Sequence, residues 1–307
     1  MSLTRRTFLH ATAAGIAGFS NGAMSNGSLN AAKPSQPTPR SLAGEVGITT
    51  SSLSGHLAAR PAAGKITLLE LPRILRNELD MRVIDLNTTV FPSTTPAYLD
   101  KFRAAADKAS CLLTNLKLNQ RGLNMNSPDK NVREKALRTY KRSIDVVAHL
   151  GLKWARPLPR KPRPDMKIHI DSYRRLADYA AKRNIRMLVE NYGWMQSDPQ
   201  SVVKLIKAVD RNLAASPDIG NWNSNAIRYR GLAATFPLAV TCDFKARRLG
   251  PHGEHTLYDL ERCFRIGWKA GFRGPWCLEH AHKDRKTLFR ELALLRDMLR
   301  RWMKQAG

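Results

Sequence analysis

Short apolar runs alternate regularly with longer segments of helical spacing, and this alternation constrains the fold of the chain more than any other feature. The apolar runs predict buried strands at residues 45–50, 81–87, 111–118, 152–158, 186–191, 213–219, 238–245 and 275–280. The segments between them predict amphipathic helices at residues 66–79, 96–109, 129–150, 169–183, 199–210, 224–235, 256–270 and 284–304. Strict alternation of strand and helix favours a parallel sheet with right-handed crossovers.

Eight such units in roughly 260 residues have the size of a closed (β/α)8 TIM barrel. The competing fold is an open doubly wound sheet, whose usual mark is a glycine-rich phosphate-binding turn after the first strand. The segment that follows the first predicted strand, TSSLSGHLAARPAAG, carries no such turn. We therefore predict an α/β fold in which residues 44–307 form a single-domain TIM barrel.

Carboxylates stand at the ends of the last four predicted strands: Glu190 in MLVE, Asp218 in SPDIGN, Asp243 in VTCDFK and Glu279 in WCLEH. In a barrel these strand ends converge on the face where catalytic groups collect. One carboxylate at a strand end is more often a helix cap, a turn residue or half of an ion pair. Independent caps would not predict an acid at four successive strand ends, so we expect the four acids to share one mouth.

Four carboxylates in one mouth cannot all stay ionised unless a cation compensates them or their pKa values rise. A divalent metal ion is the simplest compensation. Oxygen ligands suit magnesium or manganese, whereas an added imidazole would bring zinc, cobalt or nickel into range.

With these motifs, LVENYG, SPDIGNW, TCDFK and CLEH at the fifth to eighth strands, the chain resembles the xylose-isomerase-like TIM-barrel superfamily of sugar phosphate isomerases and epimerases. The resemblance extends over nearly the whole chain after residue 45. It implies one divalent metal, manganese or magnesium first and zinc or cobalt as alternatives, with Glu190, Asp218 and Glu279 as ligands. It also implies that Glu190 and Glu279 move protons on the substrate.

The seventh strand departs from the family pattern, which usually has His-x-Lys where this chain has Asp243-Phe244-Lys245. Asp243 can still ligate a hard cation, which gives a site of four oxygens and weakens the case for zinc. A second departure is Asn221, which stands where epimerases of the family often place a substrate-binding histidine.

The family resemblance further implies a mechanism and a small carbohydrate as the partner. The metal would polarise the carbonyl of a ketose and acidify the neighbouring C–H. One glutamate would remove that proton, and the other would return it on the opposite face or to the neighbouring carbon, through an enediolate. The candidate substrate-binding residues are Lys245, Arg247, Asn191, Asn221, Trp194, Trp222 and His280.

Two other functions stay open at this point. An exported barrel that binds a carbohydrate or an anionic ligand without turnover is favoured by Asp243. A metal hydrolase like the apurinic-site endonucleases is suggested by the positive charge, but such enzymes assemble several zinc ions from many histidines. In the early strands only His56 is a candidate for this role.

The chain carries 51 Lys and Arg against 25 Asp and Glu, a formal charge of +26. The charges are spread over many amphipathic segments, which favours a solvated basic surface, and no specific nucleic-acid partner is predicted. Basic clusters at residues 156–163 and 296–304 keep an anionic partner open. A homo-oligomer is left open as well.

The N-terminus carries Thr4-Arg5-Arg6-Thr7-Phe8-Leu9-His10 before a small apolar stretch at residues 11–23. This resembles a twin-arginine export signal, and the stretch is short and rich in Gly and Ala for a spanning helix. We predict a signal peptide at residues 1–25 and a flexible linker at residues 26–43. The mature protein is then expected to be periplasmic or extracellular, with no stable membrane anchor after cleavage of the signal.

Overall fold

The eight predicted strands form one parallel sheet in the computed structural model, which describes residues 40–158, 163–250 and 253–307. The sheet order is β8-β7-β6-β5-β4-β1-β10-β9. Its strands are β1 (Val46–Thr49), β4 (Val83–Asn87), β5 (Leu112–Leu118), β6 (Trp154–Pro157), β7 (Arg186–Val189), β8 (Leu213–Ala215), β9 (Cys242–Lys245) and β10 (Trp276–Glu279).

Two isolated parallel bridges, Ala215 with Ala239 and Asp218 with Asp243, join the ends of this curled sheet. The backbone N–H of Asp243 donates to the Pro217 carbonyl at 2.9 Å, and the N–H of Ile219 donates to the Asp243 carbonyl at 3.1 Å. These contacts close the barrel, as the alternation of strands and helices predicts. They also bring the acidic residues Asp218 and Asp243 side by side.

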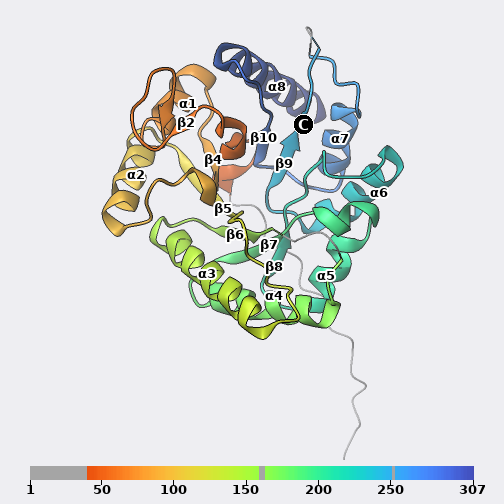
Figure 1. Ribbon diagram of the computed structural model, residues 1–307. Coiled ribbons are helices and arrows are strands. Elements are labelled where there is room, and N and C mark those ends of the chain that lie inside the picture. Colours follow the sequence, from red (N-terminus) through yellow and green to blue (C-terminus); the bar gives the residue numbers. More distant parts are fainter. Residues whose placement is uncertain (1–39, 159–162, 251–252) are drawn as a thin grey trace, which may run out of the picture. The chain divides into compact units, whose positions relative to one another are not determined.

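Within the described residues, eight α-helices surround the sheet (Figure 1). They are α1 (Leu71–Leu79), α2 (Pro96–Lys108), α3 (Lys130–His149), α4 (Met166–Ala181), α5 (Ser201–Val209), α6 (Asn225–Thr235), α7 (Leu260–Lys269) and α8 (Arg285–Ala306). Asp or Ser side chains cap several of their N-termini by accepting backbone N–H groups, as Asp129 does for α3 and Ser224 does for α6.

The predicted start of the first helix at residue 66 is wrong. Residues Ile66–Thr67 form β3, which pairs with β2 (Leu57–Ala58) in a separate two-stranded sheet. The Glu70 carboxylate accepts the backbone N–H of Thr67 at 2.8 Å and its hydroxyl at 2.7 Å. This turn delays α1 to Leu71, although Ile66 and Leu68 continue the apolar spacing of the helix.

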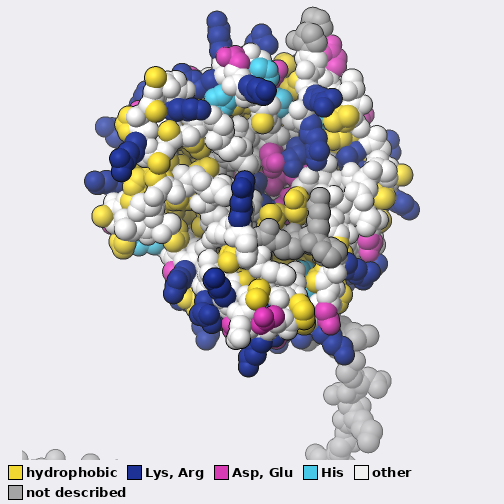
Figure 2. All heavy atoms as spheres, viewed as in Figure 1, with side chains coloured by type: hydrophobic (Ala, Val, Ile, Leu, Met, Phe, Trp, Pro, Cys, Tyr) yellow, Lys and Arg dark blue, Asp and Glu magenta, His cyan; other side chains and the backbone are white. Residues whose placement is uncertain are grey.

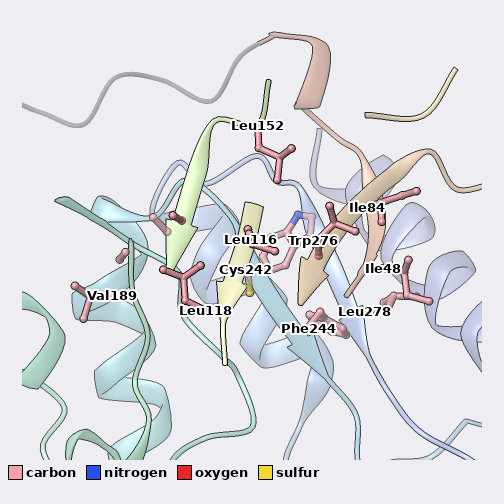
Figure 3. Packing of buried hydrophobic residues seen from close by; sticks show 14 of the residues in the cluster. Ile48, Ile84, Leu116, Leu118, Leu152, Val189, Cys242, Phe244, Trp276 and Leu278 are labelled. Atoms are coloured by element: carbon pink, nitrogen blue, oxygen red, sulfur yellow. The ribbon is translucent and has the colours of Figure 1, made fainter. Parts of the chain in front are cut away.

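Buried apolar side chains form two clusters on opposite faces of the sheet. The larger cluster includes Ile48, Ile84, Leu116, Phe244 and Leu278, and it lies between strands and helices (Figure 3). The smaller cluster comprises Leu42, Val83, Trp154, Leu188, Ala214, Val240 and Cys277.

Along a strand, members of the small cluster alternate with members of the large one, as Leu188 does with Met187 and Val189. The small cluster therefore fills the barrel interior. The next inward position lies two residues further on, at the carboxyl-terminal end of each strand. Asp85 follows Val83 in this way, Arg156 follows Trp154, Glu190 follows Leu188, and Glu279 follows Cys277.

Among the residues that the structure describes, none belongs to a helix long and apolar enough to span a bilayer. The predicted signal peptide and most of the predicted linker lie outside these residues.

Candidate functional site

Acidic side chains meet at the carboxyl-terminal end of the barrel. Glu190, Asp218 and Asp243 each bring one carboxylate oxygen within 4.8 Å of the other two, and all three residues are buried. Figure 2 shows acidic side chains in a hollow near the middle of one face, with Lys and Arg beside them. The barrel thus brings together three of the four predicted metal ligands, which we call the acidic triad.

The fourth predicted ligand, Glu279 at the end of β10, contacts cations. Its Oε1 lies 2.8 Å from the Lys245 ammonium, which is itself 2.7 Å from Asp218 Oδ2. Its Oε2 lies 3.8 Å from the ammonium of Lys117. The Glu279 side chain is 24% exposed, whereas the acidic triad is buried, so Glu279 is the most accessible of the four acids.

Three further charged residues at this end were missed in the sequence. Lys117 on β5 is buried, and its ammonium donates to Asp243 Oδ1 at 2.6 Å and to Thr49 Oγ1 at 2.8 Å. Arg156 on β6 forms an ion pair with Glu190. Asp85 on β4 is fully buried and accepts from Asn115 Nδ2 at 3.2 Å. Asp85 and Arg156 each follow an apolar strand residue by two positions, whereas Lys117 follows Asn115 and has no such signal.

Five carboxylates and three cations therefore occupy this end of the barrel, which leaves two formal negative charges. Burial raises the pKa of Asp85 to about 7 and the pKa of Asp218 to about 6, against the opposing effects of Lys117 and Lys245. Burial is the first cause of both raised values, and a divalent cation bound among these carboxylates would lower them.

In two neighbouring groups the pKa shift favours the charged form. Burial raises the pKa of Glu279, but the ammonium groups of Lys245 and Lys117 outweigh it and hold this pKa below its ordinary value. Burial lowers the pKa of Lys245, but Asp218 and Glu279 outweigh it and hold that pKa above its ordinary value. Glu279 is therefore ionised and Lys245 protonated at neutral pH.

The acidic triad has the donor set of a site for a hard cation. Asp243 Oδ2 is buried and has no hydrogen-bond partner among the described residues, while Oδ1 accepts from Lys117. Glu190 Oε1 accepts from Asn221 Nδ2 at 2.8 Å, and Asp218 Oδ1 accepts from the Gly220 N–H at 2.7 Å. Such bonds orient carboxylates and leave lone pairs for a metal ion, so the three residues could hold one.

Among the predicted substrate-binding residues, Lys245, Asn221 and Arg247 lie at or beside the acidic triad. Asn221 accepts from the Lys245 ammonium at 3.1 Å while it donates to Glu190, and Arg247 Nη2 lies 3.4 Å from Asn221 Oδ1. Asn191 is buried, and its side chain bonds to the backbone of Asp218 and Asn221. Asn191 thus holds the loop that follows β8.

The three remaining candidates lie in different surroundings. Trp222 lines a cavity of about 480 Å³ together with Asn221 and Arg247. Trp194 packs edge-to-face on His169, with ring centroids 5.9 Å apart. His280 bonds through Nδ1 to the Ala246 carbonyl and through Nε2 to the Glu291 carboxylate, both at 2.7 Å. Both of its ring nitrogens are therefore in use, and His280 ties β10 to α8.

Solved structures share this fold. One is a xylose isomerase-like TIM barrel protein from Mycobacterium smegmatis in complex with magnesium (TM-score 0.62, 17% identity, 85% of this chain and 97% of that one covered). Another is D-psicose 3-epimerase with D-tagatose from Clostridium cellulolyticum H10 (TM-score 0.65, 14% identity, 84% of this chain and 98% of that one covered). A third is apo 3-keto-D-glucoside 4-epimerase from E. coli (TM-score 0.64, 15% identity, 83% of this chain and 99% of that one covered).

A search of curated protein sequences finds no significant match. The sequence model of one family, described as "Xylose isomerase-like TIM barrel", matches residues 77–305, which is most of the chain. The chain belongs to the xylose isomerase-like TIM barrel family.

Proposed function

We propose that this protein is a sugar isomerase or epimerase that transfers a proton at a carbon next to a carbonyl group, with one manganese or magnesium ion bound. The observation that supports this most is the convergence of the acidic triad and Glu279 on one mouth of the barrel. The similar folds of two sugar epimerases and of a magnesium complex agree with it.

Glu190, Asp218 and the free Oδ2 of Asp243 would hold the cation. A divalent cation bound there would polarise a carbonyl group and stabilise negative charge on neighbouring oxygens. Glu279 is the general base in this proposal, because it is ionised at neutral pH and is the most accessible of the four acids.

Lys245 would hold the substrate oxygen on which negative charge develops, because its ammonium stays protonated and lies between Asp218 and Glu279. Glu190 is proposed to donate a second proton, taken up from solvent, while Glu279 keeps the proton that it removed; Asn221 holds Glu190 Oε1. Donation to the same carbon on the opposite face gives an epimer, and donation to the neighbouring carbon gives an isomer.

Exchange of substrate protons with solvent tests this proposal. The protein is incubated with Mn²⁺ in D₂O together with ketoses, acidic sugars or keto-glycosides, and NMR follows deuterium incorporation next to the carbonyl. We expect incorporation with at least one sugar class and a loss of at least about 100-fold in Glu279→Gln. Glu134→Gln, which removes a surface carboxylate paired with Arg175, is the matched control and should exchange like the wild type.

Two results would contradict the proposal: no exchange with any of the three sugar classes, or exchange in Glu279→Gln at the wild-type rate. The second candidate, a carbohydrate-binding barrel without turnover, is favoured by the ion pair of Lys117 with Asp243, which already neutralises one acid of the triad. Calorimetric binding of a sugar that shows no deuterium exchange in the same sample would support that candidate.

A further inference from the structure

A polar pocket of about 480 Å³ opens beside the acidic triad. Its described lining residues include two arginines, Arg228 and Arg247, but no Asp or Glu. Five carboxylates lie at the neighbouring strand ends, but the wall of this pocket carries positive charge alone. Such a wall favours an anionic ligand.

Of the two arginines, Arg228 has the greater need of an anionic partner. It is only 5% exposed and forms no ion pair within the described residues. Its guanidinium stacks on the Tyr258 ring at 3.9 Å. Its contacts are to neutral oxygens: the carbonyls of Ile219 and Trp222 and the side chain of Asn225. A guanidinium has five N–H groups, so two have no partner among the described residues. A buried cation without an anion is costly.

Two further features add positive potential to the same pocket. Arg247, in the loop after β9, is exposed, and its guanidinium contacts only the neutral Asn221 side chain among the described residues. Helix α6 begins at the pocket wall with Ser224 as its N-cap, and it has 11 residues. The positive end of its dipole and its first N–H groups favour an anion there.

Asn221 connects this pocket to the catalytic groups. It lines the pocket, donates to Glu190 Oε1 at 2.8 Å and accepts from the Lys245 ammonium at 3.1 Å. Glu190 and Lys245 do not line the pocket themselves, but both bond directly to Asn221, which does. The volume lies within the range of small-molecule sites.

We infer that the substrate is an anionic carbohydrate whose phosphate or carboxylate group binds between Arg228 and Arg247 while its carbonyl end faces Glu190 and Lys245. This inference rests on the proposed function, since it assumes that the ligand of the pocket is the substrate of the acidic cluster. Guanidinium groups bind both kinds of anion through paired N–H donors.

Calorimetry with three probes of the same ring size tests the inference: glucose 6-phosphate, glucuronate and glucose. We expect one of the two anions to bind at least about tenfold more tightly than glucose at low salt, and the tighter anion identifies the group. Arg247→Gln should weaken binding of that anion about tenfold and weaken binding of glucose by a smaller factor. Arg248→Gln removes the adjacent exposed arginine, which does not line the pocket, and should bind like the wild type.

Equal affinity for the three probes would overturn the inference, and so would equal effects of Arg247→Gln and Arg248→Gln. The titrations are repeated in Glu279→Gln, where no turnover is expected. Selective anion binding without deuterium exchange in the wild type would contradict the proposed function alone. Deuterium exchange without anion selectivity would contradict this inference alone.

Discussion

At the scale of single residues, the charge balance of the barrel mouth depends on Lys117. Its side chain is 1% exposed, and its ammonium contacts Asp243, Thr49 and Glu279. Lysine is rarely buried without a partner, because removing an ammonium from water is costly. Lys117 therefore pairs with Asp243 inside the barrel and links it to Glu279.

Replacing Lys117 by methionine removes this charge and keeps the length of the side chain. We expect the metal-free protein to lose about 3 to 5 kcal/mol of unfolding free energy, because Asp243 would stay buried without its cation. Urea denaturation in EDTA measures the loss. Lys204→Met, which breaks an exposed pair with Asp198, should change stability by less than about 1 kcal/mol. Equal losses in the two variants would contradict this account of Lys117.

Asp85 gives a prediction about pH. Its folded pKa of about 7 lies above its ordinary value of 3.8 because the carboxyl group is buried. The folded state therefore favours the protonated form, and this contribution to stability is full below pH 3.8 and lost as the pH rises to about 7.

Asp85→Asn should remove this dependence, since an amide does not titrate and can donate to Asn115 Oδ1, which has no hydrogen-bond partner among the described residues. Relative to the wild type, the free energy of unfolding of the variant should rise by about 4 kcal/mol between pH 4 and pH 8. Urea denaturation across this range checks the change. A stability difference that stays constant with pH would show that Asp85 does not titrate in this way.

Sequence reasoning identified Glu190, Asp218, Asp243 and Glu279 because each follows an apolar run at a repeated position. The same reasoning missed residues inside the strands, where alternation alone decides whether a side chain faces the barrel interior or the helices. Lys117 is one of them, since Leu116 and Leu118 beside it face the helices. How Asn191 and His280 are used could not be predicted, because their partners come from other loops and helices.

At the scale of elements, the eight strands were predictable because a parallel barrel strand is a short apolar run between two helices. The separate pairing of β2 with β3 was not predictable, because Ile66 and Leu68 continue the apolar spacing of α1. A two-residue strand carries too little pattern to be recognised, and hydrogen bonds between distant segments decide it.

Helix α6 packs closely on the loop that follows β8. A Cβ atom built on Gly231 would overlap the ring of Trp222, which is buried and lines the polar pocket. We expect Gly231→Ala to destabilise the protein by about 1 to 3 kcal/mol, although alanine favours the helix by up to about 1 kcal/mol. Thermal unfolding measures the change.

The ring of Trp222 gives the control for this prediction. In a Trp222→Phe background the smaller ring leaves room for the methyl group, so Gly231→Ala should cost less or become stabilising. The same loss in both backgrounds would show that the overlap with Trp222 is not the cause.

At the scale of the whole molecule, we propose that the chain is exported through the twin-arginine route before it acts. The conservative pair Arg5→Lys and Arg6→Lys keeps the charge and removes the arginine pair that the pathway reads. We expect the doubly substituted chain to stay in the cytoplasm at its full mass, while the wild type is shortened and leaves the cytoplasm. Cell fractionation with mass spectrometry checks this. Export of both chains alike would contradict the proposal.

In the whole molecule, the barrel brings the acidic triad close enough together to bind one divalent cation. Calorimetric titration of the EDTA-treated protein with Mn²⁺ tests it most directly, with Asp218→Asn as the site variant and Asp145→Asn, at an exposed pair with Arg183, as the control. We predict one ion per wild-type chain, unchanged binding in Asp145→Asn and binding at least about tenfold weaker in Asp218→Asn. No binding to the wild type, or equal binding to all three chains, would contradict the account.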